Sequence, residues 1–228
     1  MFTSKRSKEM LKKFVTNLHN STKRKYLDRM IDNKVFCMKI AKKYDQKYWD
    51  GNRRFGYGGY KYIPGRWTSV AQKLIKHYKL KSGSKILDVG CGKGFLLYEM
   101  LKIIPDLKIY GLDISNYALK KNFKNKNLKL YLHKAEKKYP FKSNFFDLVI
   151  SINTLHNLKI FDLKKAISEI NRVGKKKYIV VESYKNDKQL FNLQCWALTC
   201  QTFLSKEEWQ WLYKTLKYTG DYEFIYFN

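Results

Sequence analysis

The sequence predicts an α/β fold with a mostly parallel sheet of six or seven strands, helices on both faces and an N-terminal helical cap. Short apolar segments alternate with amphipathic segments of helical periodicity from residue 66 onward. One apolar segment, Lys85 to Val89, leads directly into Gly90, Gly92 and Gly94. A buried strand followed by glycines at alternate positions is typical of a loop that brings bare backbone close to a nucleotide cofactor.

Residues 1–65 predict a helical cap followed by an aromatic, glycine-rich lid. Apolar residues fall on one helical face between Met10 and Leu18 and again between Leu27 and Ala41. The cap could cover the core, close over a ligand or lie on a membrane surface. Segment 44–67 combines five glycines with three arginines and many rings. This composition favours an ordered loop over the active site, and the alternative is a surface loop that braces the helices.

Residues 66–228 predict the core domain, with an insertion at about 186–204. The helix after this insertion begins at Ser205, and Glu208 completes a capping box. A single strand follows that helix, so the sheet has six strands unless the insertion supplies a seventh. We expect helices over 68–78, 95–104, 117–123 and 163–173, and strands over 85–89, 108–112, 129–132, 147–152, 178–182 and 222–227.

The segment after the first strand carries the features of a cofactor site. Apolar residues recur at helical spacing from Phe95 to Ile104, so the loop opens a helix whose first N–H groups point at the ligand. The second strand ends at Asp113, 19 residues beyond Gly94, where a carboxylate can accept both hydroxyls of a ribose. Phe95 stands where the dinucleotide pattern G-x-G-x-x-G has its third glycine, so the pattern here is D-x-G-x-G-x-G.

At these residues the chain resembles the class I S-adenosylmethionine-dependent methyltransferases. Asp88 occupies the acidic position two residues before the first glycine, and the resemblance continues through Ala135-Glu136 and Phe145 to Ser151. It covers about residues 66–184. The resemblance implies a Rossmann-like methyltransferase fold, S-adenosylmethionine as the cofactor, S-adenosylhomocysteine as the product, and no metal.

The resemblance also implies which residues bind the cofactor. Lys134 departs from the family pattern, because the family often has an acidic residue before the alanine at 135. The usual acidic contact to the adenine amine is therefore absent or replaced. The expected cofactor-binding residues are Asp88, Gly90, Cys91, Gly92, Gly94, Asp113, Ile114, Ala135, Glu136, Ser151, Tyr60 and Arg66.

Residues after the fourth strand are expected to face the methyl acceptor. His156 is the candidate base, because an imidazole titrates near neutral pH, and Asn153 is a second catalytic candidate. The alternative for His156 is a structural hydrogen-bonding role. The expected substrate-binding residues are Tyr57, Glu182 and Trp196.

The composition of the chain limits the classes of binding partner that we expect. The net charge is +28, and lysines spread along the chain favour a solvated coat over a nucleic-acid surface. An anionic substrate or a membrane surface would also be attracted. The four cysteines form no C-x-x-C pair, and no apolar run is long enough to span a bilayer, which favours a cytoplasmic setting with reduced thiols.

Three hypotheses follow. The first is a methyltransferase acting on a small molecule or a saccharide. The chain has neither an N-P-P-Y motif after the fourth strand nor a Pro-Cys thiolate, and these absences disfavour nucleobase chemistry. The second is an RNA methyltransferase that uses the basic surface. The third is a non-catalytic protein that binds a partner through a cofactor fold. The sequence leaves the acceptor and the oligomeric state open.

Overall fold

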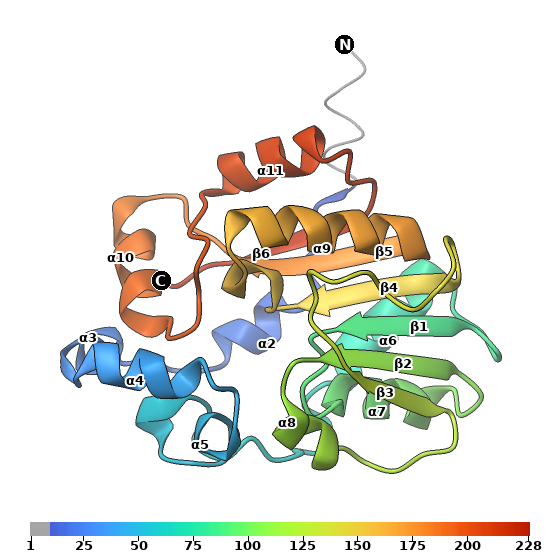
Figure 1. Cartoon of the computed structure of the whole chain (residues 1–228), viewed down its shortest axis with the longest axis horizontal. Coiled ribbons are helices and arrows are strands. Elements are labelled where there is room, and N and C mark those ends of the chain that lie inside the picture. The colour runs from blue at the N-terminus through green and yellow to red at the C-terminus, as the bar shows by residue number, and fades with distance from the viewer. Residues whose placement is uncertain (1–9) are drawn as a thin grey trace.

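A computed structural model describes residues 10–228 of the chain. Its centre is a six-stranded sheet in the order β3-β2-β1-β4-β5-β6, and every strand pairing is parallel (Figure 1). The strands are β1 (Lys85–Val89), β2 (Lys108–Asp113), β3 (Leu128–Leu132), β4 (Phe146–Ile152), β5 (Gly174–Glu182) and β6 (Asp221–Ile225).

The predicted α/β class is confirmed, and the sheet has six strands rather than seven. The insertion folds as a helix, α10 (Asp187–Trp196), so it lends no strand. Asn186 caps this helix by accepting a hydrogen bond from the Gln189 backbone N–H. The predicted capping box opens α11 (Lys206–Thr215), with both of its hydrogen bonds present.

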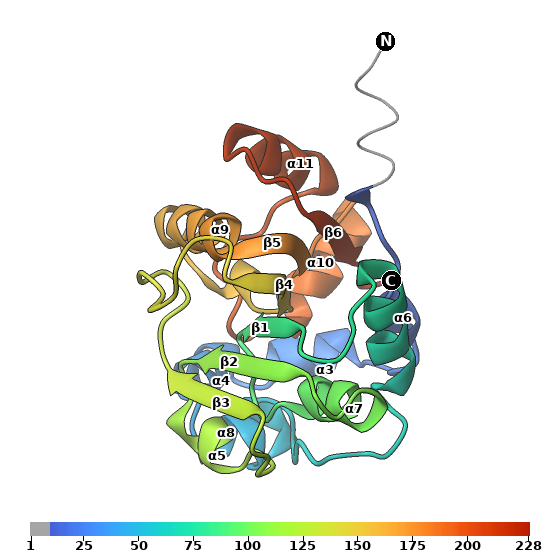
Figure 2. The same ribbon diagram turned by 90° about the vertical axis from the view of Figure 1, so that its right-hand side faces the viewer.

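Helices cover both faces of the sheet (Figure 2). Neighbouring strand residues point to opposite faces, so Ile86 joins one apolar cluster and Leu87 the other. The Ile86 cluster includes α6 (Thr68–Tyr78) and α7 (Phe95–Ile103), and the Leu87 cluster includes α9 (Ile160–Val173) and α11. The short helix α8 (Asn116–Lys120) follows β2. The sheet is therefore buried on both sides, and its carboxyl edge is left to form a site.

Residues 1–9 of the predicted cap lie outside the described residues. The part of the N-terminal segment that follows them differs from the prediction. The predicted helix between Met10 and Leu18 is wrong for most of its length, because Leu11 forms an isolated parallel bridge with Tyr222 of β6 and the helix α2 (Thr16–Asn20) begins only at Thr16. The buried carboxylate of Glu223 accepts the backbone N–H groups of Phe14, Val15 and Thr16. These N–H groups are satisfied by a side chain and need no helix.

The second predicted cap helix is broken into α3 (Tyr26–Ile31) and α4 (Lys34–Ala41). Asn33 lies between them with a φ of 38° and caps α4 with its side chain. Segment 44–67 is mostly irregular but contains a short helix, α5 (Gln46–Trp49), and a 3₁₀ turn over Arg53–Phe55. Helix α3 packs against α10, so the cap and the insertion meet beside the sheet (Figure 1).

Two further features concern the whole described chain. Between residues 10 and 228, no helix is both long enough and apolar enough to cross a membrane. All four cysteines are buried free thiols.

Candidate functional site

The glycine loop follows β1 at the carboxyl edge of the sheet. Gly90, Gly92 and Gly94 have φ values of 83°, 54° and 69°, a region that disfavours any residue with a Cβ. A Cβ at Gly90 would lie 2.0 Å from the Thr154 hydroxyl oxygen, and a Cβ at Gly92 would lie 2.8 Å from the Trp49 ring. Both the backbone conformation and the space therefore require glycine at these two positions.

Two buried carboxyl groups flank this loop. Asp113 accepts the Gly92 backbone N–H at 2.7 Å and the Ser115 backbone N–H at 2.7 Å, one on each oxygen. Asp88 has a buried oxygen, Oδ1, with no hydrogen-bond partner. Burial, together with the nearby charge of Asp113, raises the pKa of Asp88 to about 8. A ligand that brings a cationic donor would satisfy this oxygen and stabilise the ionised form.

Residues of segment 44–67 hold it over the glycine loop. The Trp49 indole N–H donates to the Ser115 hydroxyl at 2.9 Å, and the Tyr57 ring stacks on the Trp49 ring with centroids 5.1 Å apart. Lys93, inside the loop, bonds both carboxylate oxygens of Asp50 at 2.6 and 2.7 Å. The segment is thus ordered and packed over the site. That it opens as a lid stays a prediction.

Two adjoining cavities lie between this segment and the sheet edge, with volumes of about 460 Å³ and 400 Å³. The smaller cavity lies over the ends of β1 and β2, and the larger one extends toward the end of β5. They share seven lining residues, which are Tyr48, Trp49, Tyr57, Gly90, Ile152, Asn153 and Asn157.

Most of the residues that the sequence singled out line these cavities. The smaller cavity is lined by Asp113, Ile114, Ala135 and Glu136, as well as by the shared residues. The larger cavity is lined by Tyr57, Tyr60, Arg66, Asp88, Gly90, Cys91, Gly92, Asn153, His156, Glu182 and Trp196.

Two of the expected cofactor residues, Ser151 and Gly94, line neither cavity. Ser151 is fully buried within the sheet and donates its hydroxyl to the Val89 carbonyl at 2.9 Å. Gly94 is the N-cap of α7, and a Cβ there would meet the Asn122 amide at 2.5 Å. Both residues therefore lie behind the residues that line the cavities and support their positions.

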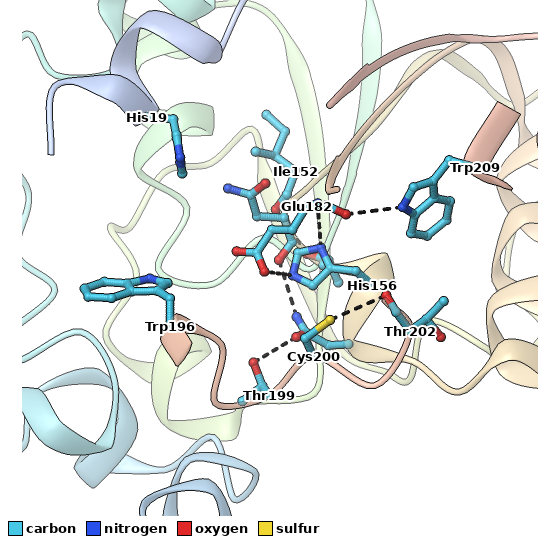
Figure 3. Close-up of polar contacts among 12 residues, drawn as sticks. His19, Ile152, His156, Glu182, Trp196, Thr199, Cys200, Thr202 and Trp209 are labelled. Carbon is cyan, nitrogen blue, oxygen red and sulfur yellow. Dashed lines mark hydrogen bonds and ion pairs between the residues drawn. The ribbon is translucent and has the colours of Figure 1, made fainter. Parts of the chain in front are cut away.

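His156 and Glu182 form a hydrogen-bonded pair at the end of β5 (Figure 3). The Glu182 backbone N–H donates to Nδ1 of His156 at 3.2 Å, so Nδ1 is an acceptor. The imidazole proton then sits on Nε2, which lies 3.3 Å from a carboxylate oxygen of Glu182. Burial lowers the pKa of His156, and the charge of Glu182 acts in the opposite direction. Both ring nitrogens are therefore engaged, whereas the Glu182 carboxylate reaches the larger cavity.

Sequence analysis did not single out Trp49, Arg24 or Arg29, which also line the larger cavity. The two arginines lie in a stretch with the pattern of an amphipathic helix, where charged residues are expected to face solvent. Their place in the cavity depends on the contact between α3 and α10, which no local pattern indicates. In the described part of the chain, no three His, Cys, Asp or Glu side chains are grouped to hold a metal ion.

The fold and the site together define a class of protein. The parallel sheet, the glycine loop after β1, the acid at the end of that strand and the second acid at the end of β2 match the features expected from the resemblance to the class I S-adenosylmethionine-dependent methyltransferases. A family model described as "Methyltransferase domain" matches residues 80–220. The chain belongs to this methyltransferase family.

Curated relatives match the same part of the chain. The uncharacterized protein MJ1252 of Methanocaldococcus jannaschii is 31% identical over 153 residues, covering 67% of this chain and 51% of that protein. The mitochondrial arginine-hydroxylase NDUFAF5 of Mus musculus is 32% identical over 109 residues, covering 48% and 31%. The tRNA (carboxymethyluridine(34)-5-O)-methyltransferase of Arabidopsis thaliana is 38% identical over 111 residues, covering 48% and 25%. The chain spans about half or less of the length of these relatives.

Solved structures share the fold. A SAM-dependent methyltransferase from Aquifex aeolicus has a TM-score of 0.50 at 23% identity, covering 68% of this chain and 83% of that one. Phosphoethanolamine N-methyltransferase 2 of Haemonchus contortus, in complex with S-adenosyl-L-methionine, has a TM-score of 0.51 at 16% identity, covering 85% and 44%. At these identities the likeness shows the fold alone.

Proposed function

We propose that the chain is an S-adenosylmethionine-dependent methyltransferase that moves a methyl group to an oxygen or nitrogen nucleophile of a small molecule or a saccharide. The observation that carries this proposal is the buried, partnerless Asp88 oxygen beside the glycine loop. Membership of the methyltransferase family supports the reaction class. The cavity of about 460 Å³ next to the loop supports an acceptor of small size.

The residues present fit the cofactor. Asp88 supplies an acceptor for its ammonium group, and each oxygen of Asp113 keeps a lone pair for a ribose hydroxyl after its backbone bond. When bound, S-adenosylmethionine supplies an electrophilic methyl group on a sulfonium. Arg66 and Tyr60 line the larger cavity and are assigned to its carboxylate end. Its adenine side is assigned to Ile114, Ala135 and Glu136.

Glu182 takes the role of proton acceptor in this proposal. Methyl transfer needs the nucleophile held in line and, where it carries a proton, a base within reach. His156 has no free ring nitrogen in its present hydrogen bonds, so it positions the Glu182 carboxylate instead of acting on the substrate. Asn153 has a buried Oδ1 without a partner and offers an acceptor to a bound molecule. We therefore assign to Glu182 the role of base that the sequence predicted for His156.

Calorimetric titration with S-adenosylhomocysteine tests the cofactor part of the proposal. We expect saturable binding to the wild type that changes little with salt. Asp113→Ala is expected to weaken it at least about tenfold, since a hydrogen bond to a charged group is worth about 1.5–3 kcal/mol. Asp28→Ala changes an exposed carboxylate and is the matched control. Absence of binding to the wild type would overturn the proposal.

An RNA methyltransferase is the second candidate. The net charge of +28 and the similarity to the Arabidopsis thaliana tRNA methyltransferase favour it. The two candidates differ in salt dependence, because lysines that bind phosphates release counterions. An affinity for tRNA that falls steeply between low and moderate salt, together with methyl transfer to that tRNA, would select the RNA candidate over the small-molecule one.

A further inference from the structure

The larger cavity has a strongly positive wall. Five basic residues line it, against two carboxyl groups, Asp88 and Glu182. Within residues 10–228, none of the five basic side chains lies within ion-pair distance of a carboxylate. The basic residues are Arg24, Arg29, Arg53, Lys61 and Arg66.

Three of these guanidinium groups surround one indole ring. Arg29, Arg53 and Arg24 lie 4.4, 5.0 and 5.5 Å from the centroid of the Trp196 ring. Contact with an aromatic face holds a guanidinium in place without neutralising it. Burial lowers the pKa of Arg29 to about 10, so its side chain is still charged at neutral pH. The fold therefore gathers three positive charges around Trp196.

The three arginines differ in the donors they leave free. Arg29 donates to the carbonyl oxygens of Arg53, Gly56 and Trp196. These three hydrogen bonds give Arg29 a structural role. Arg53 donates to the Gly56 carbonyl through a single nitrogen, Nη1. Its other donors have no partner among the hydrogen bonds of the described chain.

Arg24 is held in place by hydrogen bonds, and one of its donors has no partner. One of its nitrogens donates to the carbonyls of Thr22 and His19, and a second donates to Nδ1 of His19. His19 is neutral at pH 7, because burial and the Arg24 charge lower its pKa to about 4. The buried Nε of Arg24 has no partner. A buried charged donor without an acceptor is costly, and a bound anion would remove that cost.

This wall lies on the acceptor side of the site. The sheet order places β4 and β5 on one side of β1, and β2 on the other. Asp113 ends β2, whereas Glu182 ends β5. Burial lowers the pKa of the Arg24 guanidinium, and Glu182 lies close enough to it to oppose that shift. Figure 3 shows the Glu182 carboxylate on the side of His156 that faces Trp196 and His19.

We propose that the methyl acceptor carries an anionic oxyacid group, a phosphate monoester or a carboxylate, which Arg24 and Arg53 bind beside Trp196 while Glu182 faces the nucleophile. The inference rests on the proposed function and narrows its substrate class. Guanidinium groups match the two-oxygen geometry of such anions and bind them through paired hydrogen bonds. Arg66, which lines the same cavity, is assigned to the cofactor together with Tyr60.

Calorimetric titration at constant ionic strength tests this inference, with the protein saturated by S-adenosylhomocysteine. Inorganic phosphate is the probe in one arm and acetate in the other, so the arms distinguish the two anion types. We expect saturable binding of one probe with a Kd near or below about 1 mM. Arg53→Gln and Arg24→Gln should each weaken it at least about tenfold, and Arg24→Lys should restore only part of it.

Arg54→Gln is the matched control. Arg54 adjoins Arg53 in the chain but pairs with Asp32 at 2.6 Å and does not line the cavity. All variants should keep the wild-type affinity for S-adenosylhomocysteine, and this affinity also reports that they fold. The inference is overturned if neither probe binds, or if Arg54→Gln weakens binding as much as Arg53→Gln. Failure of the wild type to bind S-adenosylhomocysteine would instead overturn the proposed function.

Discussion

Replacing Asp88 with Asn should stabilise the protein while it weakens cofactor binding. The carboxyl is buried, one oxygen has no partner, and its pKa in the folded chain is about 8 against an ordinary value of 3.8. A raised pKa means that the folded state favours the protonated form. Stability from this group is therefore present at low pH and falls as the pH rises from about 4 to about 8. A neutral amide carries no such dependence.

The structure also sets the size of the effect. At pH 7 the shift corresponds to an upper limit of about 4 kcal/mol, at 1.36 kcal/mol for each pKa unit between 3.8 and the working pH. Relaxation and water entry reduce such penalties, so we expect Asp88→Asn to gain about 1 to 3 kcal/mol. For a chain of this length, that raises Tm by about 2 to 12 °C.

The assay is thermal unfolding followed by circular dichroism at about pH 5, 7 and 9, combined with titration of S-adenosylhomocysteine. We expect the Tm advantage of Asp88→Asn to grow between the first two values, and its affinity for the ligand to fall at least about tenfold. A variant that is less stable than the wild type at pH 9, or that binds the ligand normally, would refute the reasoning.

Asp147→Asn is a control for which we expect the opposite change in Tm. Burial raises the pKa of Asp147, but hydrogen bonds from the Lys85 backbone and the Lys175 side chain outweigh burial and leave the pKa below its ordinary value. Its contribution to stability is present above that ordinary value and is lost as the pH falls. Asp147→Asn should therefore lower Tm at pH 7, and the difference should shrink toward low pH.

Five further substitutions test other contacts. Glu182→Gln should lower the rate of methyl transfer by about 10²-fold or more while leaving S-adenosylhomocysteine affinity unchanged, and His156→Gln should lower it less; both are measured with methyl-labelled cofactor in a single turnover. Gly92→Ala places a Cβ 2.8 Å from the Trp49 ring and should weaken S-adenosylhomocysteine binding about tenfold, as read by calorimetry. Glu223→Gln removes the charge that accepts three backbone N–H groups and should cost about 1 to 3 kcal/mol in urea unfolding. Trp49→Phe loses the bond to Ser115 and should speed amide exchange in residues 44–67, whereas unchanged exchange would show that this bond does not hold the segment.

Local patterns were sufficient to predict the core elements. The strand Lys85–Val89 and the helix Thr68–Tyr78 have the predicted bounds, because each combines clear periodicity with a definite boundary at its end. The start of the N-terminal segment was predicted wrongly because the competing interaction is distant in sequence. Glu223 lies 209 residues from Phe14, and no pattern near Phe14 indicates that a carboxylate will accept its N–H.

In the candidate site, too, features set by local sequence could be predicted, whereas features set by distant contacts could not. Asp88, Asp113 and the glycines could be placed from spacing, because one strand-loop-helix unit and the next strand hold them in a local frame. The hydrogen-bond partners of His156 could not be predicted, since the backbone N–H and the carboxylate that contact its two ring nitrogens both belong to Glu182. Those partners come from β5, whose place beside β4 is a property of the sheet.

The two halves of the site also lie in different parts of the sequence, and this separation bears on specificity. Asp88, Asp113 and Glu182 fall within the family match at residues 80–220, so they belong to the region that this chain has in common with the family. Arg24 and Arg53 precede that region and reach the cavity only because the cap folds against α10. A shared core with a separate cap allows one chemistry to serve different acceptors. The family match therefore supports the reaction class without indicating the acceptor, and our proposal assigns the choice of acceptor to the cap arginines beside Trp196.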